Sequence, residues 1–324
     1  MSRPTTLSTA RRALPFTAPW LLAPMEGVTE PCFRDLVLAR NAAHELGGAF
    51  TEFVRVNALP VPVKVVRRHL GPLRFEQPVG VQLMGADLEQ LAQTALNAVA
   101  AGAPLVDLNF GCPAKGAIAG CAGSALLRDP RAVERTLRAV TDVVHDVPVT
   151  AKIRAGYDDA ALLEELARAA QAGGAALLTV HCRTRAEAYQ DEVDWTRIAR
   201  AVASVSIPVC GNGSVNTHAD FERMRRETGC AFAMVGRGAL ADPWIFSGRG
   251  VTRGEAARFL DDYATTMRAR HQWPGGGIVA RIKQLLRYWT AGALLPDEAT
   301  RSAWLREQDG AALLARIGDI ARDA

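Results

Sequence analysis

Short apolar runs alternate with amphipathic segments over most of this chain. Eight runs rich in β-branched and other apolar residues predict buried strands. Several are followed by segments whose apolar residues lie three and four positions apart, which predicts amphipathic helices. Asp87 and Asp129 are typical helix starts, and Gly102, Gly173 and Gly229 are typical helix ends. The predicted strands are Leu21–Pro24, Ala49–Val54, Val79–Met84, Leu105–Asn109, Val147–Ile153, Leu177–His181, Ile207–Gly211 and Ala231–Gly236, and the predicted helices are Leu88–Ala101, Ala132–His145, Ala160–Ala172 and Ala219–Glu227.

This order of elements predicts the fold class. Eight strands that alternate with helices over about 230 residues are typical of an α/β protein with a (β/α)8 TIM barrel. A doubly wound parallel sheet is the alternative, but no G-x-G-x-x-G motif follows the first predicted strand. That strand ends instead in Ala23-Pro24-Met25-Glu26. We therefore expect the barrel.

The pattern changes after Asp242-Pro243, because only helices are predicted from there on, separated by Gly275–Gly277 and Leu295-Pro296. We expect a catalytic barrel at 18–248 and a small all-helical domain at 249–324. Residues 1–17 contain three arginines, no acid and no continuous apolar core, so we expect a disordered leader rather than a secretory signal. The predicted helices of the tail are Glu255–His271, Val279–Ala291, Asp297–Gln308 and Gly310–Arg322.

Composition and charge exclude several protein classes. The 324 residues are 49% hydrophobic and 22% charged, unlike collagen, disordered chains or disulfide scaffolds. None of the six cysteines forms a C-x-x-C pair, so no metal site is indicated, and no apolar run is long enough to span a membrane. The net charge of +4 is too small to indicate nucleic-acid binding by itself. We expect a cytoplasmic monomer with no protein partner.

Polar residues collect where the predicted strands end. In a barrel the carboxyl ends of the strands share one face, and catalytic groups lie there. The last two ends carry Gly211-Asn212-Gly213-Ser214 and Gly236-Arg237-Gly238-Ala239, and such turns let backbone N–H groups approach a phosphate. Flavin mononucleotide (FMN) is the natural occupant, with Arg237 as its charge partner. The polar residues at the strand ends include Met25, Glu26, Glu52, Arg55, Gln82, Asn109, Lys152, Arg154, His181, Arg183, Asn212 and Arg237.

Lysine is rare in this chain, which makes one of these residues informative. Arginine supplies 34 of the 38 basic residues, so a retained lysine indicates a position that needs a compact ammonium group. Lys152 in a barrel mouth needs an anion or an electron-rich ring beside it, such as the N1–C2=O edge of a reduced flavin. A Schiff-base lysine is the alternative. Gln82 suits the pyrimidine edge of the flavin, because its amide both donates and accepts. For His181 the alternative is a core histidine.

Cys112 lies between glycine and proline in the segment that follows the fourth predicted strand. This context predicts a loop, and hence an exposed and reactive thiol. No His–Asp pair surrounds the cysteine in sequence. We therefore expect Cys112 to be a proton donor rather than a hydrolytic nucleophile.

The helical tail contains a basic stretch without acidic residues, which the overall charge conceals. Between Asp262 and Asp297, arginines and one lysine are interleaved with aromatic residues, a combination that suits phosphate contact and base stacking. A solvated helix face is the alternative. The stretch contains Arg268, Arg270, His271, Trp273, Arg281, Lys283, Gln284, Arg287, Tyr288 and Trp289.

Together these segments resemble the tRNA-dihydrouridine synthases over about residues 20–324. Thr51–Val56 and Ala280–Gln284 are most similar to the class C subgroup, which modifies uridine 16 of the D-loop. The matching segments are Leu22–Thr29, Thr51–Phe53, Val81–Gly85, Asp107–Lys115, Lys152–Arg154, Val180–Thr184, Gly211–Gly213 and Gly236–Ala239.

The resemblance implies an FMN enzyme that reduces uridine in tRNA to 5,6-dihydrouridine, with NADPH as the reductant. It implies that flavin N5 gives a hydride to uracil C6 while Cys112 protonates C5 from the opposite face. The implied FMN contacts are Pro24, Met25, Glu26, Gln82, Lys152, His181, Asn212, Gly213, Ser214, Gly236 and Arg237. The implied substrate and tRNA contacts are Arg55, Asn109, Lys115, Arg183, Arg281, Lys283, Gln284 and Arg287.

Phe110, Ala114 and Ser214 depart from the residues that are common in this family. They leave the expected reaction unchanged. The alternatives are a dihydrouridine synthase for another position, such as uridine 20, and an FMN barrel reductase of a small free pyrimidine or enoate. A Schiff-base lyase that uses Lys152 and a non-catalytic RNA-binding protein are more distant alternatives.

Overall fold

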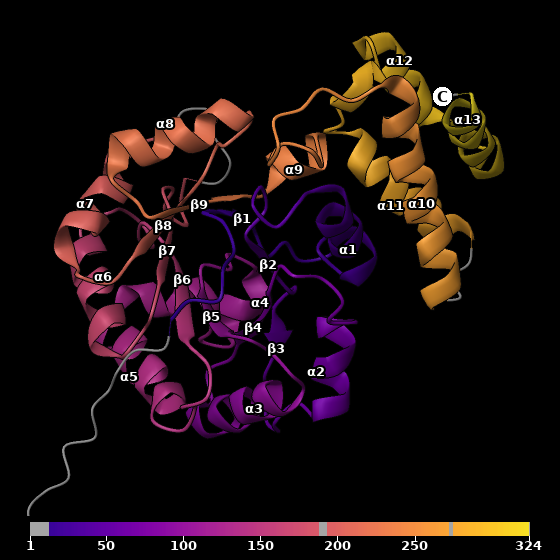
Figure 1. The fold of residues 1–324 in the computed structure, drawn as a ribbon. Helices are drawn as coiled ribbons and strands as arrows, with labels where there is room; N and C mark the ends of the chain where they lie inside the picture. The colour runs from indigo at the N-terminus through magenta and orange to yellow at the C-terminus, as the bar shows by residue number, and fades with distance from the viewer. Residues whose placement is uncertain (1–12, 188–192, 272–274, 324) are drawn as a thin grey trace, which may run out of the picture.

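The computed structural model describes residues 13–187, 193–271 and 275–323. Within them nine parallel strands form one sheet in the order β2-β1-β9-β8-β7-β6-β5-β4-β3, and β2 also pairs with β4. This extra pairing closes the sheet into a barrel (Figure 1), so the predicted (β/α)8 fold is confirmed. The strands are β1 Trp20–Leu22, β2 Gly48–Phe50, β3 Val54–Arg55, β4 Val79–Met84, β5 Val106–Phe110, β6 Val149–Arg154, β7 Leu178–His181, β8 Val209–Asn212 and β9 Phe232–Val235.

The second predicted strand, Ala49–Val54, is wrong in one respect, because it consists of two short strands. β2 ends at Phe50 and β3 begins at Val54. Between them the Glu52 side chain accepts a hydrogen bond from the backbone of Gly27, in the loop after β1. Both strands pair with β4, so β2 and β3 together occupy one position in the barrel wall.

Helices surround the strands and alternate with them along the chain. Asp87 and Asp129 cap their helices as predicted, since their carboxylates accept from the backbone of Gln90 and Arg131. The sequence patterns did not predict α1, α2, α4, η1, α7 or α9. The helices of this layer are α1 Pro31–Arg40, α2 Val63–Leu70, α3 Leu88–Ala100, α4 Lys115–Ala119, the 3-10 helix η1 Gly123–Arg128, α5 Pro130–Thr141, α6 Leu163–Ala172, α7 Thr196–Ser204, α8 His218–Thr228 and α9 Arg237–Ala241.

The lower end of the barrel interior is apolar. Phe16 packs there with its ring centroid 6.0 Å from that of Phe50 and 5.5 Å from that of Phe232. Phe16 belongs to the predicted leader 1–17, of which the structure describes residues 13–17. These five residues pack against the barrel or lie beside it, while residues 1–12 lie outside the described residues.

The described part of the chain after α9 contains helices only, and they pack beside α1 (Figure 1). Tyr263 donates to Glu30 Oε1 at 3.1 Å, and Arg40 pairs with Asp262. The predicted helix Val279–Ala291 is wrong at both ends, because α11 includes the glycines and stops before Tyr288. The tail consists of α10 Arg253–His271, α11 Gly275–Leu286, the 3-10 helix η2 Ala291–Ala293, α12 Glu298–Arg306 and α13 Gly310–Arg322.

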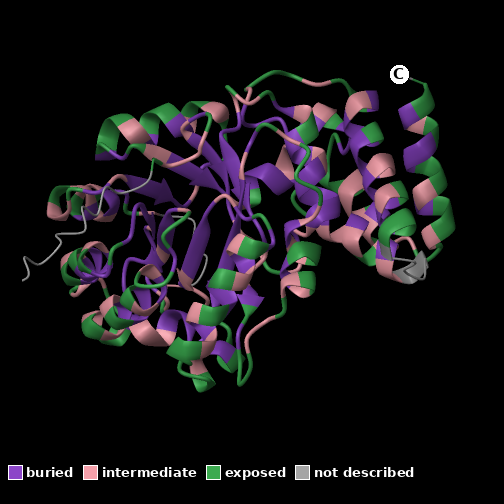
Figure 2. Cartoon of the chain, turned by 60° about the horizontal axis from the view of Figure 1, so that its bottom comes forward, coloured by how far each residue is buried: buried purple, intermediate pink, exposed green. Residues whose placement is uncertain are grey.

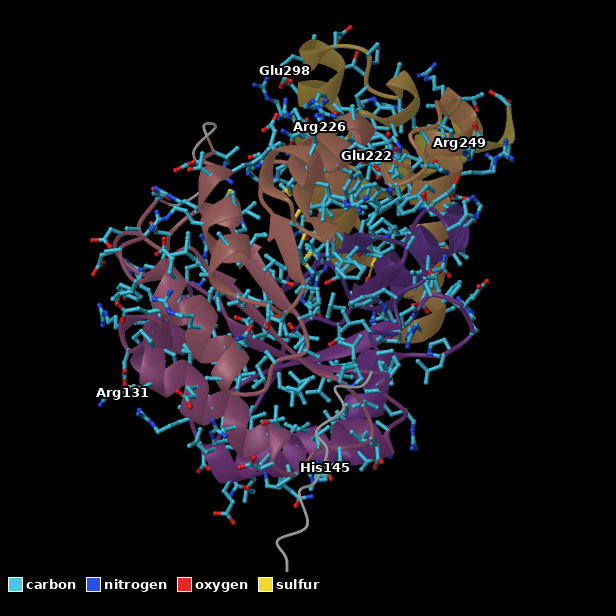
Figure 3. The ribbon with its side chains drawn as sticks, turned by 60° about the vertical axis from the view of Figure 1, so that its left-hand side comes forward. Arg131, His145, Glu222, Arg226, Arg249 and Glu298 are labelled. Carbon is cyan, nitrogen blue, oxygen red and sulfur yellow. The ribbon has the colours of Figure 1, made fainter. Side chains whose placement is uncertain are left out.

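Buried residues concentrate in the strands and on the helix faces that turn toward them (Figure 2). Charged side chains such as Arg131 and Glu298 lie at the outer edge of the molecule (Figure 3). No helix among the described residues combines the length and the apolar character that crossing a membrane requires.

Arg34 of α1 is an exception to this division, because its guanidinium is fully buried. It donates to the last carbonyls of α2, those of His69 at 3.1 Å and Leu70 at 2.6 Å, and to Asp35 at 3.2 Å. Burial lowers the pKa of Arg34, and the adjacent Asp35 carboxylate opposes this shift. The residue thus supplies donors to helix-end carbonyls that have no partner within their own helix.

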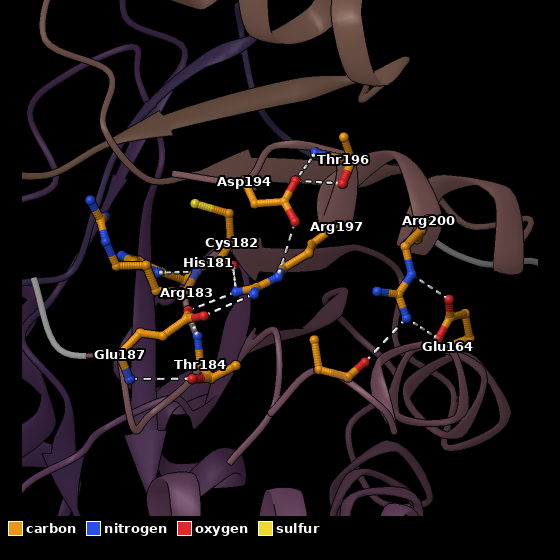
Figure 4. Close-up of polar contacts among 11 residues, drawn as sticks. Glu164, His181, Cys182, Arg183, Thr184, Glu187, Asp194, Thr196, Arg197 and Arg200 are labelled. Atoms are coloured by element: carbon orange, nitrogen blue, oxygen red, sulfur yellow. Dashed lines mark hydrogen bonds and ion pairs between the residues drawn. The ribbon is translucent and has the colours of Figure 1, made fainter. Parts of the chain in front are cut away.

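We expect Arg34→Met to destabilise the protein by about 3 kcal/mol, because it leaves a buried carboxylate and two buried carbonyls without their donor. The measurement is urea unfolding followed by circular dichroism. Arg200→Met is the matched control, since Arg200 binds Glu164 at the surface (Figure 4) and its loss should cost less than about 1 kcal/mol. Equal losses for the two variants would contradict the role assigned to Arg34.

Candidate active site

A pocket of about 440 Å³ opens at the carboxyl end of the barrel. Its wall contains residues from the ends of most strands, together with three residues at the end of α11 and just after it. Every residue expected to contact FMN lies in this wall, and so do Cys112 and Asn109. The expected residues that line the pocket are Pro24, Met25, Glu26, Gln82, Asn109, Cys112, Lys152, His181, Arg183, Asn212, Gly213, Ser214, Gly236, Arg237, Gln284 and Arg287.

The backbone around Cys112 is held at each of its polar groups. Asn109 Oδ1 accepts from the N–H groups of Gly111 and Cys112, both at 2.9 Å. Arg154 Nε donates to the Gly111 carbonyl at 2.9 Å, and the backbone of Ser124 donates to the Cys112 carbonyl at 3.1 Å. The thiol itself is partly exposed and lines the pocket. A loop fixed in this way presents its side chain in one orientation.

Lys152 reaches the floor of the pocket from β6. Its Nζ donates to Asn212 Oδ1 at 3.0 Å, and Asn212 Nδ2 donates to the Met234 carbonyl at 2.8 Å. Burial lowers the pKa of Lys152 to about 8, helped by Arg154 and opposed by Asp107. The ammonium is therefore only marginally stable in its charged form, and an anionic ligand would stabilise it.

His181 at the end of β7 is held as a neutral ring. Burial lowers its pKa well below the ordinary value, and Lys152, Arg154, Arg183 and Arg237 lower it further. Its Nδ1 accepts from the backbone N–H of Arg183 at 3.2 Å, so the neutral ring carries its proton on Nε2. His181 is thus a hydrogen-bond donor to the pocket, surrounded by cations that favour an anion.

The segment after β7 is anchored by Arg197 of α7, as Figure 4 shows. The guanidinium binds the Glu187 carboxylate at 2.6 and 2.8 Å and the Cys182 carbonyl at 3.1 Å. It also pairs with Asp194 at 3.4 Å. Next to this clamp, Arg183 Nη2 donates to Ser214 Oγ at 2.9 Å. The clamp fixes the loop that follows His181 and carries Arg183.

Backbone rather than side chains forms the part of the pocket at the ends of β8 and β9. Gly213 has a φ of +128°, and a Cβ there would lie 2.4 Å from Cys182 Sγ. The next residue, Ser214, has a φ of +52°. A Cβ on Gly236 would lie 3.3 Å from Met25 Sδ. Close backbone with Arg183 and Arg237 beside it fits a phosphate group, as expected from the two glycine motifs.

The helical tail contributes one side of the pocket. Gln284, Arg287 and Tyr288 lie in the wall, and Arg281 Nη1 donates to Gln284 Oε1 at 3.3 Å. Tyr288 has a large aromatic side chain, yet it is 41% exposed. The opening therefore joins a barrel face to a basic and aromatic face of the tail. Trp273, which belongs to the predicted basic stretch, lies outside the described residues.

Four of the expected tRNA contacts lie outside this wall. Arg55 lines a neighbouring cavity of about 280 Å³ near α4, and Lys115 is exposed at the start of α4. Arg281 lies close to Glu26. Burial raises the pKa of Glu26, and the charges of Arg55 and Arg281 oppose that rise. Lys283 Nζ donates to the Glu307 carbonyl at 2.6 Å, so it is engaged within the tail. Their contact with tRNA stays a prediction.

One buried residue below the pocket was not among the expected site residues. Asp107 on β5 accepts from Thr150 and from Gln82. Its burial raises its pKa to about 6, and the hydrogen bonds from Gln82 and Thr150 oppose that shift. The sequence feature that could have pointed to Asp107 is its spacing of two residues from Asn109, because this spacing places both side chains on the inner face of the barrel.

Comparison with known proteins agrees with this geometry. The family model described as "Dihydrouridine synthase (Dus)" matches residues 21–272. A tRNA-dihydrouridine(16) synthase of Cupriavidus necator is 42% identical over 69% of this chain and 71% of its own, and one of Ralstonia nicotianae is 36% identical over 92% and 94%. A tRNA-dihydrouridine synthase B of Xanthomonas axonopodis is 39% identical over 74% of this chain and 69% of its own. The chain thus belongs to the dihydrouridine synthase family.

Proposed function

We propose that this protein reduces uridine 16 in the D-loop of tRNA to 5,6-dihydrouridine, with bound FMN and with NADPH as the reductant. The observation that carries this proposal is the pocket, which combines Cys112, the expected FMN contacts and one wall from the basic tail. Family membership argues against a Schiff-base lyase and against a non-catalytic RNA-binding protein. Position 16 is supported by the names of the Cupriavidus and Ralstonia relatives.

The residues of the pocket fit FMN at both ends. The close backbone at Gly213 and Gly236, with Arg183 and Arg237, fits the phosphate. Lys152 on the floor would hold negative charge on the flavin ring, and bound FMN would supply the hydride for the uracil ring.

The reaction also needs a proton on the face of the uracil opposite the hydride donor. Cys112 is the candidate donor, because its loop is fixed and its thiol lines the pocket. The S–H bond breaks, a C–H bond forms at C5, and water returns the proton to the thiolate. Asn109 lies beside this path with one amide hydrogen available for the substrate.

The tail explains why a polynucleotide fits this pocket better than a free pyrimidine does. Arg287 and Tyr288 are exposed at the opening, and Arg55 and Lys115 are exposed on the barrel side. Cations on two sides of an opening can contact phosphates that flank an extruded base, while an aromatic ring can stack on a neighbouring base. We therefore expect binding that weakens as the salt concentration rises.

The direct test uses purified FMN-loaded protein, NADPH and tRNA transcripts that carry uridine or cytidine at position 16. We expect dihydrouridine in the uridine-16 transcript and none at that position in the cytidine variant, by mass spectrometry of nuclease fragments. A matched transcript with cytidine at position 20 should remain a full substrate. Dihydrouridine at position 20 instead would show that the enzyme is specific for uridine 20. Efficient reduction of free uridine without preference for tRNA would refute the proposal.

Cys112→Ala should lower turnover by at least about a hundredfold while FMN content and tRNA affinity stay unchanged, because only the proton donor is lost. Turnover is followed by NADPH oxidation with saturating tRNA. Cys121→Ala is the control, since Cys121 is an exposed thiol in the same segment but does not line the pocket. Full activity of Cys112→Ala would exclude the proton-donor role.

The affinity for FMN should fall as the pH rises above about 8, because the pKa of Lys152 is lowered to about 8 in the free protein and the ammonium is lost above that value. Lys152→Met should bind FMN about tenfold more weakly and lose this pH dependence. Flavin fluorescence quenching measures both. Lys64→Met, which changes an exposed lysine on α2, should behave like the unmodified protein. An unchanged pH profile in Lys152→Met would contradict the assignment.

A further inference from the structure

A carboxylate lies buried inside the barrel, below the pocket, and the proposed reaction does not use it. Asp107 is 1% exposed and precedes Asn109 by two residues on β5. The strand register places it beside Gln82 of β4 and Thr150 of β6. Thr150 Oγ1 donates to one of its oxygens at 2.6 Å, and Gln82 Nε2 donates to the other at 2.7 Å. Two neighbouring strands thus supply its donors.

This carboxylate fixes the direction of the hydrogen bonds above it. An ionised carboxylate only accepts, so Gln82 turns its NH2 group toward Asp107 and its oxygen away from it. That oxygen accepts from Asn109 Nδ2 at 2.7 Å. Asn109 is thereby oriented with Oδ1 toward the loop, where it accepts from the N–H groups of Gly111 and Cys112.

Shape alone does not select this arrangement, because an amide fills the same space after its oxygen and nitrogen are exchanged. If Gln82 were reversed, its oxygen would face the carboxylate and its NH2 group would face the NH2 group of Asn109. If Asn109 were then reversed as well, its NH2 group would face two backbone N–H groups. Buried donors or acceptors without partners are costly, so the whole chain keeps one polarity.

We propose that Asp107 is a positioning residue, which acts through Gln82 and Asn109 to hold the Cys112 loop in the orientation that points the thiol into the pocket. The inference deepens the proposed function, on which its consequence for turnover rests. The consequence for the loop does not depend on the reaction.

Three single substitutions separate polarity from mere packing. Asp107→Leu removes the acceptor and leaves the Gln82 donor without a partner. Asp107→Asn can keep its oxygen toward Gln82, because the Thr150 hydroxyl can accept from the new NH2 group. Thr150→Val removes the other hydrogen bond of the carboxylate and leaves the path to Cys112 intact, so it is the matched control.

A reversal of the whole chain gives the sharpest test. In Asn109→Asp alone, a carboxylate oxygen faces the Gln82 oxygen, so two acceptors meet. Gln82 cannot relieve this by reversing its amide, because its oxygen would then face the Asp107 carboxylate. The double variant Asp107→Asn/Asn109→Asp moves the carboxylate to the upper end. Gln82 can then reverse, accept from the new amide at 107 and donate to the new carboxylate at 109. The second oxygen of that carboxylate still accepts from Gly111 and Cys112.

The measurement is hydrogen exchange of the Gly111 and Cys112 amides by mass spectrometry, on the full-length protein at about pH 8. Thr150→Val and Asp107→Asn should exchange as slowly as the unmodified protein. Asp107→Leu and Asn109→Asp should exchange about tenfold faster at these two amides, with peptides elsewhere unchanged. The double variant should recover slow exchange.

The proposal would be overturned if the Gly111 and Cys112 amides of Asp107→Leu exchanged as slowly as those of the unmodified protein. It would also be overturned if these amides exchanged as fast in the double variant as in Asn109→Asp. Asp107→Leu is uninformative if it does not fold or exchanges faster throughout the chain. In that case the exchange of the Gly111 and Cys112 amides in Asn109→Asp, compared with that in the double variant, tests the proposal.

Turnover provides the second readout. In the FMN-loaded fraction, Asp107→Leu should lower kcat about tenfold with little change in the KM for tRNA, and Asp107→Asn should restore it. A KM effect without a kcat effect would contradict positioning of the thiol. The exchange experiment needs neither tRNA nor NADPH, so its failure overturns the role of Asp107 alone. Failure of the unmodified protein to reduce tRNA would overturn only the proposed function.

Discussion

Closure of the sheet is the constraint on which the rest of this structure depends. Because β2 pairs with both β1 and β4, the wall forms a ring, and the carboxyl ends of all its strands meet on one rim. Only inward-facing side chains fill the ring. They are apolar at the lower end, where Phe16 packs against Phe50, and polar beneath the rim on β4, β5 and β6. A buried polar layer must satisfy itself internally, and Gln82, Asp107 and Thr150 do so.

The rim itself is divided by charge. Lys152 lies on β6, and Arg183 and Arg237 follow β7 and β9. Burial lowers the pKa of His181 most, and these cations lower it further. The carboxylates Glu26, Glu30 and Glu52 lie farther along the rim, near β1 and β2, where Glu26 and Glu30 raise the pKa of Glu52 beyond the effect of its burial. An anionic ligand is therefore drawn to one side of the opening. The same division orients a ligand that has one charged end and one neutral end.

Most of the fold could be predicted from the sequence, because strands that are buried on both faces are continuous apolar runs. The prediction failed at the start of α11, which begins at Gly275 although glycine is a poor helix former. Catalytic groups of barrels lie at the carboxyl ends of the strands, and this rule predicted that the polar strand-end residues would share one pocket. It could not find the role of Asp107, because its partners depend on the register between strands. Nor could helical spacing show that Lys283 binds the Glu307 carbonyl.

The pocket has walls from two parts of the chain, with Gln284, Arg287 and Tyr288 opposite the barrel rim. A molecule that touches both walls contributes its binding energy to their association, in addition to the contact between Tyr263 and Glu30. Occupancy and docking of the tail are thus thermodynamically linked, and a ligand at a hundred times its dissociation constant adds about 2.7 kcal/mol to the docked form. Substitutions in the contact between α1 and α10 consequently act on affinity in the pocket, without touching what is bound there.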